Sequence, residues 1–311
     1  MSAQTDWLLK GDSAIRYLTH RDLLLATPEQ CSALQEQLAL EGICARLLSY
    51  QRENGHWGLH YYQPKWTCTH YTLLELKDIG ALPALAACRS IVLRMFDECT
   101  LPSGAMNLSK HVHPNDTCVD AMVLNYASYF CPEETRLNQL AKHIITEQRQ
   151  DGGFTWDANS NHGDPHTTIC ALEGLGQYAA SRACGEKVRV DESIQDGVSF
   201  LLSNQLFINS ADRRFQKLTY PARYRYDLLR ALEFFVRQKI SYDERMRPAV
   251  LWLSEKRTKE GLWRLEHTHA GNVHFALEEV GKPSRFVTWK AMLVLNAYGR
   301  DVLDAIDSNL A

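Results

Sequence analysis

A carboxylate, a thiol and an imidazole occupy matching places in this chain. Asp116 and Cys118 stand two residues apart at the start of one apolar run, and His166 opens the next run fifty residues later. Zinc uses these ligand types, and a catalytic zinc takes three of them and keeps one position open. A helix N-terminus would also favour the Cys118 thiolate that a metal binds. An isolated Asp-x-Cys is more often a helix cap beside a buried cysteine, so the pair alone does not decide.

Arg225 is a candidate anion-binding residue at the head of a later apolar run, where it follows Tyr224. A guanidinium presents a bidentate fork to phosphate or carboxylate. Pairing with Asp227 or Glu233 on its own helix is an equally good interpretation. The sequence therefore offers Arg225 as a site residue without separating the two roles.

The elements that carry these residues repeat along the chain. The segment QRENGHWG at residues 51–58 and the segment QRQDGGF at residues 148–154 each precede a polar loop and an apolar run. Apolar runs begin near residues 66, 116, 166, 224 and 285, which are 50, 50, 58 and 61 residues apart. Their apolar residues have helical spacing, and their glycine pairs suit turns that need positive φ. Each repeat is therefore predicted to be a helix, a turn and a second, more apolar helix.

The second helix of each repeat is apolar nearly all round and must be buried. Counting the segment Ile15 to Leu25 as one more such helix gives six, which favours closure into a ring over an open solenoid. Small residues such as Gly174 and Gly176 would allow close contacts between helices. We expect an all-α chain, an α/α toroid of five to six helical hairpins, forming a single domain over residues 1–311.

Composition excludes some classes of partner. The 311 residues are 45% hydrophobic and 23% charged, which is typical of a globular chain. The net charge of −3 and the lack of a basic stripe give no reason to expect a nucleic-acid partner. No apolar run approaches the roughly 20 residues that span a bilayer. The start of the chain lacks signal-peptide features, and nine scattered cysteines without a CxxC suit reduced thiols, so we expect a cytoplasmic protein.

The repeated glycine and aromatic turn resembles that of the prenyltransferase and squalene-cyclase superfamily, from about residue 44 to 300. That superfamily folds as an α6/α6 toroid with a central active site. Its cyclase branch uses an Asp-x-Asp-Asp acid, which this chain lacks. The chain is closer to the β subunits of zinc-dependent protein prenyltransferases, where an Asp-x-Cys and a histidine on the next inner helix bind zinc. The resemblance therefore implies Zn²⁺ held by Asp116, Cys118 and His166.

The same resemblance assigns a diphosphate-binding role to residues six and three before the aspartate. Lys110 and His113 hold those positions, with His113 in place of the lysine that is usual in the family. Cys118 is followed by Val119 rather than an aromatic residue, and the chain is shorter than a typical β subunit. We therefore expect a small apolar, isoprenoid-like substrate, with or without a diphosphate. A thiol is one candidate acceptor. Whether a partner subunit is required stays open.

The sequence favours an enzyme, a zinc-dependent transferase of the prenyltransferase type, and leaves two alternatives. One is a hydrolase or lyase in which zinc-bound water attacks, with Asp120, His113 or His162 as general base. The other is a toroid without enzymatic activity that binds a hydrophobic ligand or a partner protein. Thiol dependence of turnover would separate the two enzymes, and metal content would separate both from the binding protein.

Overall fold

The computed structural model describes residues 2–109 and 116–308, so the predicted site residues Lys110 and His113 lie outside the described residues. The described part is helical, with isolated β-bridges and no strand. Its α-helices are α1 (Ala3–Leu9), α2 (Ser13–Asp22), α3 (Pro28–Gln37), α4 (Gly42–Ser49), α5 (Thr69–Asp78), α6 (Ala86–Cys99), α7 (Thr117–Phe130), α8 (Leu137–Thr146), α9 (Pro165–Ala179), α10 (Lys187–Ser203), α11 (Leu228–Arg237), α12 (Arg247–Glu255) and α13 (Arg285–Ser308). Within this part, no helix is both long and apolar enough to cross a membrane.

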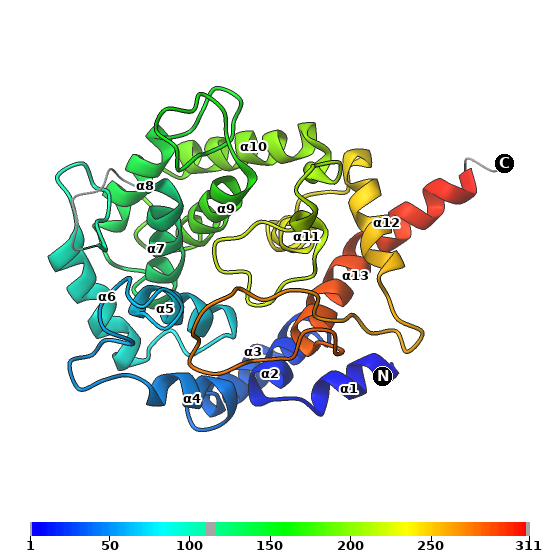
Figure 1. The fold of residues 1–311 in the computed structure, drawn as a ribbon, viewed down its shortest axis with the longest axis horizontal. Helices are drawn as coiled ribbons and strands as arrows, with labels where there is room; N and C mark the ends of the chain where they lie inside the picture. Colours follow the sequence, from blue (N-terminus) through cyan, green and yellow to red (C-terminus); the bar gives the residue numbers. More distant parts are fainter. Residues whose placement is uncertain (1, 110–115, 309–311) are drawn as a thin grey trace.

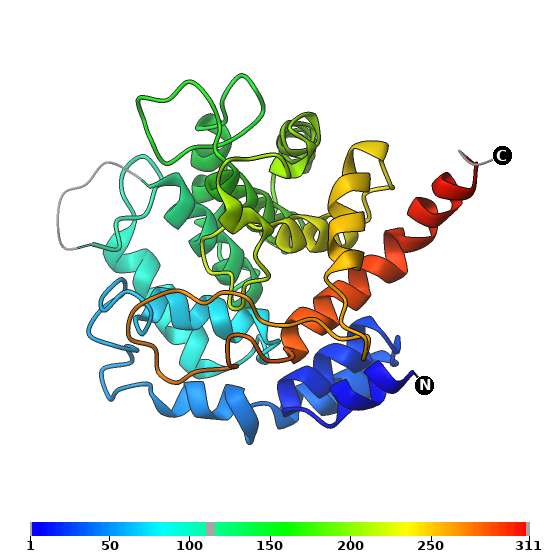
Figure 2. The same ribbon diagram turned by 45° about the vertical axis from the view of Figure 1, so that its right-hand side comes forward.

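The helices form a ring of six pairs, an α/α toroid (Figure 1). Helices α2, α5, α7, α9, α11 and α13 lie on the inside, and α1, α4, α6, α8, α10 and α12 precede them on the outside. The last inner helix, α13, packs against α2 and closes the ring, beyond which its C-terminal end projects (Figure 2). The predicted six inner helices are therefore confirmed.

A shared set of hydrogen bonds fixes the turn before three of the inner helices. In each, a buried threonine in the first turns of the inner helix accepts a hydrogen bond from the backbone N–H of an aromatic residue and donates one to its carbonyl. The N···Oγ1 distances are 3.2 Å for Trp57 and Thr69, 2.9 Å for Phe154 and Thr168, and 3.0 Å for Trp263 and Thr288. The glycine of each turn has positive φ, as the sequence predicted. In each of these repeats, hydrogen bonds therefore hold the turn against the inner helix that follows it.

Asp120 takes the place of this threonine in the repeat that begins α7. Its Oδ1 accepts from the backbone N–H of Met106 at 2.8 Å, and its Oδ2 lies 3.4 Å from His143 Nε2 on α8. The side chain is fully buried, and burial raises the pKa of its carboxyl despite the bond to His143. Asp120 was predicted as a candidate base, but its position makes it an acceptor that holds the turn.

We expect Thr168→Val to lower the free energy of unfolding by about 1–2 kcal/mol, since the buried N–H of Phe154 then has no acceptor. Thr168→Ser keeps the hydroxyl and is the matched control. Urea unfolding of the two variants measures the difference. Equal stability of valine and serine at this position would show that the hydroxyl does not hold the turn.

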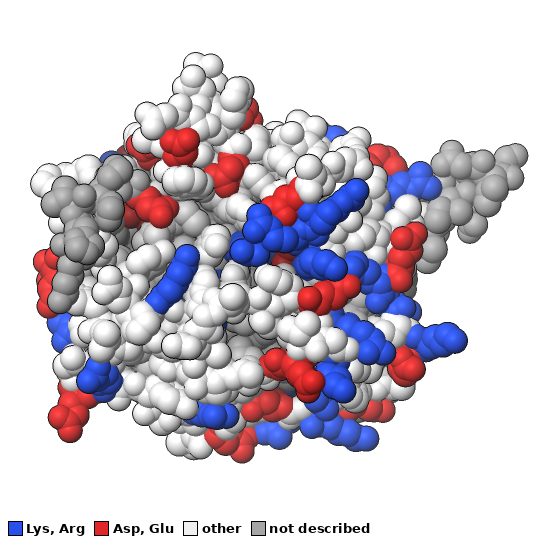
Figure 3. Space-filling view, viewed as in Figure 1, with Lys and Arg blue, Asp and Glu red and all other residues white. Residues whose placement is uncertain are grey.

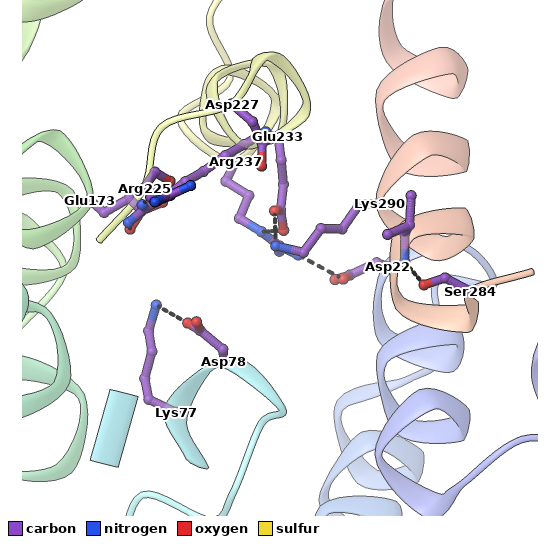
Figure 4. A network of polar contacts seen from close by, with 12 residues as sticks. Asp22, Lys77, Asp78, Glu173, Arg225, Asp227, Glu233, Arg237, Ser284 and Lys290 are labelled. Carbon is purple, nitrogen blue, oxygen red and sulfur yellow. Dashed lines mark hydrogen bonds and ion pairs between the residues drawn. The ribbon is translucent and has the colours of Figure 1, made fainter. Parts of the chain in front are cut away.

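The inner helices α2, α9, α11 and α13 are joined by buried ion pairs (Figure 4). Arg230 Nη2 lies 2.7 Å from Glu173 Oε2, and Glu233 lies between Lys290 at 2.6 Å and Arg237 at 2.9 Å. Because charged groups of both signs meet in pairs, the low-dielectric interior can hold them. This part of the ring interior is therefore filled by paired charges, with a cavity of only about 230 Å³ beside them.

Candidate functional site

A cavity of about 360 Å³ opens where four inner helices begin. Asp116 and Cys118 come from the start of α7, His166 from the start of α9, and Lys65 and Arg225 from the segments that lead into α5 and α11. A second cavity of about 430 Å³ adjoins it, shares several wall residues and extends over Met106 and Leu108. The structure thus brings together four of the predicted site residues, Asp116, Cys118, His166 and Arg225.

Two other predicted residues lie elsewhere. Asp120 points from α7 toward α8 and does not line the cavity. His162 lies in an exposed loop, where its Nδ1 is 3.5 Å from Asp151 Oδ2 and its side chain is 86% exposed. Neither lines either cavity, and the third candidate base of the hydrolase alternative, His113, lies outside the described residues.

Asp116 caps the N-terminus of α7. Its Oδ1 accepts from the backbone N–H groups of Cys118 at 3.1 Å and Val119 at 3.3 Å. The carboxylate opens toward the cavity, yet the surrounding protein displaces water and raises the pKa of its carboxyl, which the two backbone donors oppose only in part. The capping role that the sequence allowed for Asp116 is therefore present.

Cys118 is a buried thiol next to a second one, Cys170 on α9. The hydrogen bond between the two thiols, together with burial and the nearby carboxylates, raises the pKa of Cys118 well above its ordinary value. Cys170 also donates to the carbonyl of Tyr224 at 3.5 Å and accepts from Arg230 Nη2 at 3.5 Å. The expected lowering of the Cys118 pKa by the helix N-terminus is thus outweighed, and the thiol is protonated at neutral pH.

His166 is held by a bond from the chain that leads into α11. Its Nδ1 accepts from the backbone N–H of Tyr226 at 2.8 Å, and burial lowers the pKa of the ring. A neutral imidazole that accepts through Nδ1 carries its proton on Nε2, so neither nitrogen has a lone pair for a metal.

The three predicted ligands therefore do not fit zinc in this conformation. Asp116 caps a helix, Cys118 is a hydrogen-bonded thiol, and His166 is already an acceptor. In the part of the chain that the structure describes, no three His, Cys, Asp or Glu side chains are grouped to hold a metal ion. Zinc remains a prediction from the sequence. Binding of zinc by His166 would require the backbone N–H of Tyr226 to move away from the ring.

The mouth of the cavity carries cations that lack carboxylate partners. Lys65 Nζ lies 4.8 Å from the ring centre of Tyr224 and 4.9 Å from that of Trp66, and Arg225 Nη1 bonds His267 Nε2 at 3.2 Å. Among the described residues neither Lys65 nor Arg225 forms an ion pair, whereas the nearby Arg214 is paired with an aspartate. The alternative pairing of Arg225 along α11 is thus not found. Lys and Arg side chains gather near the centre of this face (Figure 3).

Aromatic side chains form much of the remaining wall. Tyr62 and Tyr71 lie with their hydroxyl oxygens 3.4 Å apart, and Trp66 stacks on Tyr224 with ring centres 6.1 Å apart. Trp156 lines both cavities and is 64% exposed. Trp156 thus differs from Trp57 and Trp263, the buried tryptophans of the other turns.

Comparisons with known proteins give a distant likeness of fold. No family model matches the chain, and no curated protein matches it. A structural search finds the apo structure of the type II terpene cyclase MstE from Scytonema, which is 12% identical, with a TM-score of 0.33, over 87% of this chain and 97% of that one.

Proposed function

We propose that the two adjoining cavities bind an organic anion with an apolar body, such as an isoprenoid diphosphate, as the substrate of a transferase. The observation that supports this most directly is that Lys65 and Arg225 line one cavity without carboxylate partners. Cations that are not neutralised by the protein attract an anionic ligand to a cleft. The anionic group would bind at this mouth.

Helix N-termini add to this preference. The cavity lies at the beginnings of α7 and α9 and beside those of α5 and α11, so the positive ends of four helices lie close to it. Each carries partial positive charge and backbone donors that favour anions. The only carboxylate on this wall in the described residues is Asp116, whose pKa is raised by burial. Among the residues that line this cavity, the cations Lys65, Arg214 and Arg225 outnumber the one carboxylate.

The adjoining cavity suits the apolar part of such a ligand. Its apolar lining residues include Met106, Leu108, Val119 and Trp156. Asp116, Asp157 and several amide and hydroxyl side chains line the rest. Burial of an isoprenoid chain against these side chains would contribute roughly 25 cal/mol per Å² of apolar surface. An apolar body in one cavity and an anionic group in the other matches a substrate that carries both.

In a transfer reaction the same cations would act on the leaving group. Negative charge develops on a departing diphosphate, and fixed donors near it lower the barrier. Lys65 and Arg225 would take this role, and the hydrogen bond that Arg225 donates to His267 Nε2 would orient its guanidinium. A thiol is one candidate acceptor, and a turnover assay with and without added thiols tests it.

We expect farnesyl diphosphate to bind more tightly than either inorganic pyrophosphate or farnesol. Lys65→Met and Arg225→Met should each weaken its binding about ten- to a hundredfold, because each removes a charge-assisted hydrogen bond. Arg213→Met, at an exposed position outside the cavity, is the control and should leave binding unchanged. Isothermal titration calorimetry measures all of these affinities.

Two outcomes contradict the proposal. If farnesol binds as tightly as the diphosphate, the cations contribute nothing; if pyrophosphate binds as tightly, the apolar wall contributes nothing. Elemental analysis of the wild type beside Cys118→Ala and His166→Ala tests the zinc prediction separately. Binding without turnover would favour the alternative of a ligand-binding toroid.

A further inference from the structure

A separate cavity of about 650 Å³ lies beneath the segment 268–280, which crosses one face of the ring (Figures 1 and 2). None of its lining residues lines the candidate site. Apolar side chains such as Leu47, Tyr220 and Leu277 make up most of its wall. Its volume is in the usual range for a small-molecule site.

Contacts with α4, α5 and the chain before α5 fix the roof of this cavity. Trp66 Nε1 donates to the carbonyl of Ala270 at 2.6 Å, and Thr72 Oγ1 lies 3.0 Å from His274 Nε2. The Arg46 guanidinium lies 3.8 Å above the ring of Phe275. The cavity is therefore preformed, and a ligand would not need to order the segment.

Arg223 lies in the wall and is incompletely bonded. Its Nε and Nη2 reach the same oxygen of Glu75, at 3.1 and 3.0 Å, while its buried Nη1 has no hydrogen-bond partner among the described residues. The side chain is only 4% exposed, and its backbone has φ of 56°. A buried donor without an acceptor and a left-handed non-glycine residue both cost free energy, and such strain clusters at ligand sites.

The charges in the wall restrict what could bind here. Arg223 is paired with Glu75, although burial raises the pKa of that carboxyl to about 7. Two further carboxylates, Glu278 and Glu279, line the cavity. His269 adds no positive charge, since burial lowers its pKa to about 3. An anion would meet net negative charge, whereas a neutral oxygen would satisfy the free guanidinium nitrogen.

We propose that this cavity binds a neutral, apolar molecule that carries a single acceptor oxygen, a ketone or an ester. Arg223 Nη1 is covered by protein in this structure, so the guanidinium would rotate to let this oxygen accept from it. The apolar walls would hold the body of the molecule. The two cavities share no lining residue, although Arg223 directly precedes Tyr224, which lines the anion site.

Fluorescence titration with 6-propionyl-2-(dimethylamino)naphthalene, a neutral aromatic ketone whose emission moves to the blue in apolar surroundings, tests this site. We expect saturable, blue-shifted binding to the wild type. The double variant Glu75→Gln/Arg223→Met, which removes both charges together, should weaken binding at least tenfold. Val273→Trp, which fills the cavity from a partly exposed position, should abolish it. Arg225→Met, in the anion site, should leave it unchanged.

Any of three results overturns the proposal. The first is the absence of saturable binding to the wild type. The second is binding to Val273→Trp with the affinity of the wild type. The third is loss in Arg225→Met, which places the ketone in the anion site. Val273→Trp alters no buried charge, so it keeps the test decisive if the double variant fails to fold.

Discussion

Glu233→Gln is expected to lower the free energy of unfolding by about 3–5 kcal/mol at neutral pH. The carboxylate of Glu233 is buried, and its oxygens lie 2.9 Å from Arg237 Nε and 2.6 Å from Lys290 Nζ. Glutamine keeps the shape of the side chain but leaves Lys290 without its ion-pair partner and Arg237 with Asp22 alone. Removing one member of a buried pair is costly because the remaining charge stays desolvated. Urea unfolding at pH 7 measures the loss.

The pH dependence of this loss identifies the ionised carboxylate as its cause. Burial alone would raise the pKa of Glu233, but Lys290 and Arg237 outweigh burial and hold it at about 2, below the ordinary 4.5. A carboxyl with a lowered pKa stabilises the fold fully above pH 4.5, and this stabilisation is lost as the pH falls through 2. The difference between wild type and Glu233→Gln should therefore narrow from pH 4.5 to 2.

The matched control is Glu192→Gln, at an exposed position of α10. It should change stability by less than about 0.5 kcal/mol at every pH. A difference between wild type and Glu233→Gln that stays constant from pH 7 to 2 would contradict an ionised, paired Glu233.

The ring could be predicted from the sequence because its repeat is local. The turns at Gly55, Gly152 and Gly261 need positive φ, and a fixed partner follows each turn in the next helix. The indoles of Trp57 and Trp263 each donate to the carbonyl ten residues before them, at 2.8 Å in both cases. Such bonds are set by short segments, so their pattern is visible in the order of residue types.

The location of the candidate site could be predicted from the sequence, but the hydrogen-bond partners of its residues could not. Asp116, Cys118 and His166 line one cavity because each opens an inner helix at the same end of the ring. Their bonding depends on groups far along the chain: the bond to His166 comes from Tyr226, sixty residues later. Contacts of that kind leave no local pattern.

The positions and partners of the charged residues were the hardest features to predict from the sequence. Lys65 was not among the predicted site residues, and Arg214 follows no repeat at all. The buried pair between Arg230 and Glu173 joins residues 57 positions apart, and either alone would be interpreted as a solvated charge on a helix. Their burial follows from closure of the ring, which brings α9 beside the start of α11.

Gly174→Ala tests the contact that holds the two halves of the candidate site together. A Cβ at Gly174 on α9 would lie 2.4 Å from the carbonyl oxygen of Ala121 on α7. Backbone cannot rotate away as a side chain can, so the two helices must separate. We expect a loss of about 3 kcal/mol, at the upper end of what overpacking costs, measured by urea unfolding.

Gly299→Ala makes the same chemical change inside α13, where the nearest atom to the new Cβ is a side-chain carbon of Leu295 at 3.7 Å. There alanine should stabilise the helix by about 0.5–1 kcal/mol, since it restricts the unfolded chain more than glycine does. Equal effects at Gly174 and Gly299 would contradict a close contact between α7 and α9. Because Cys118 and His166 sit at the ends of these two helices, separating them at Gly174 should also weaken binding of farnesyl diphosphate, whereas Gly299→Ala should not.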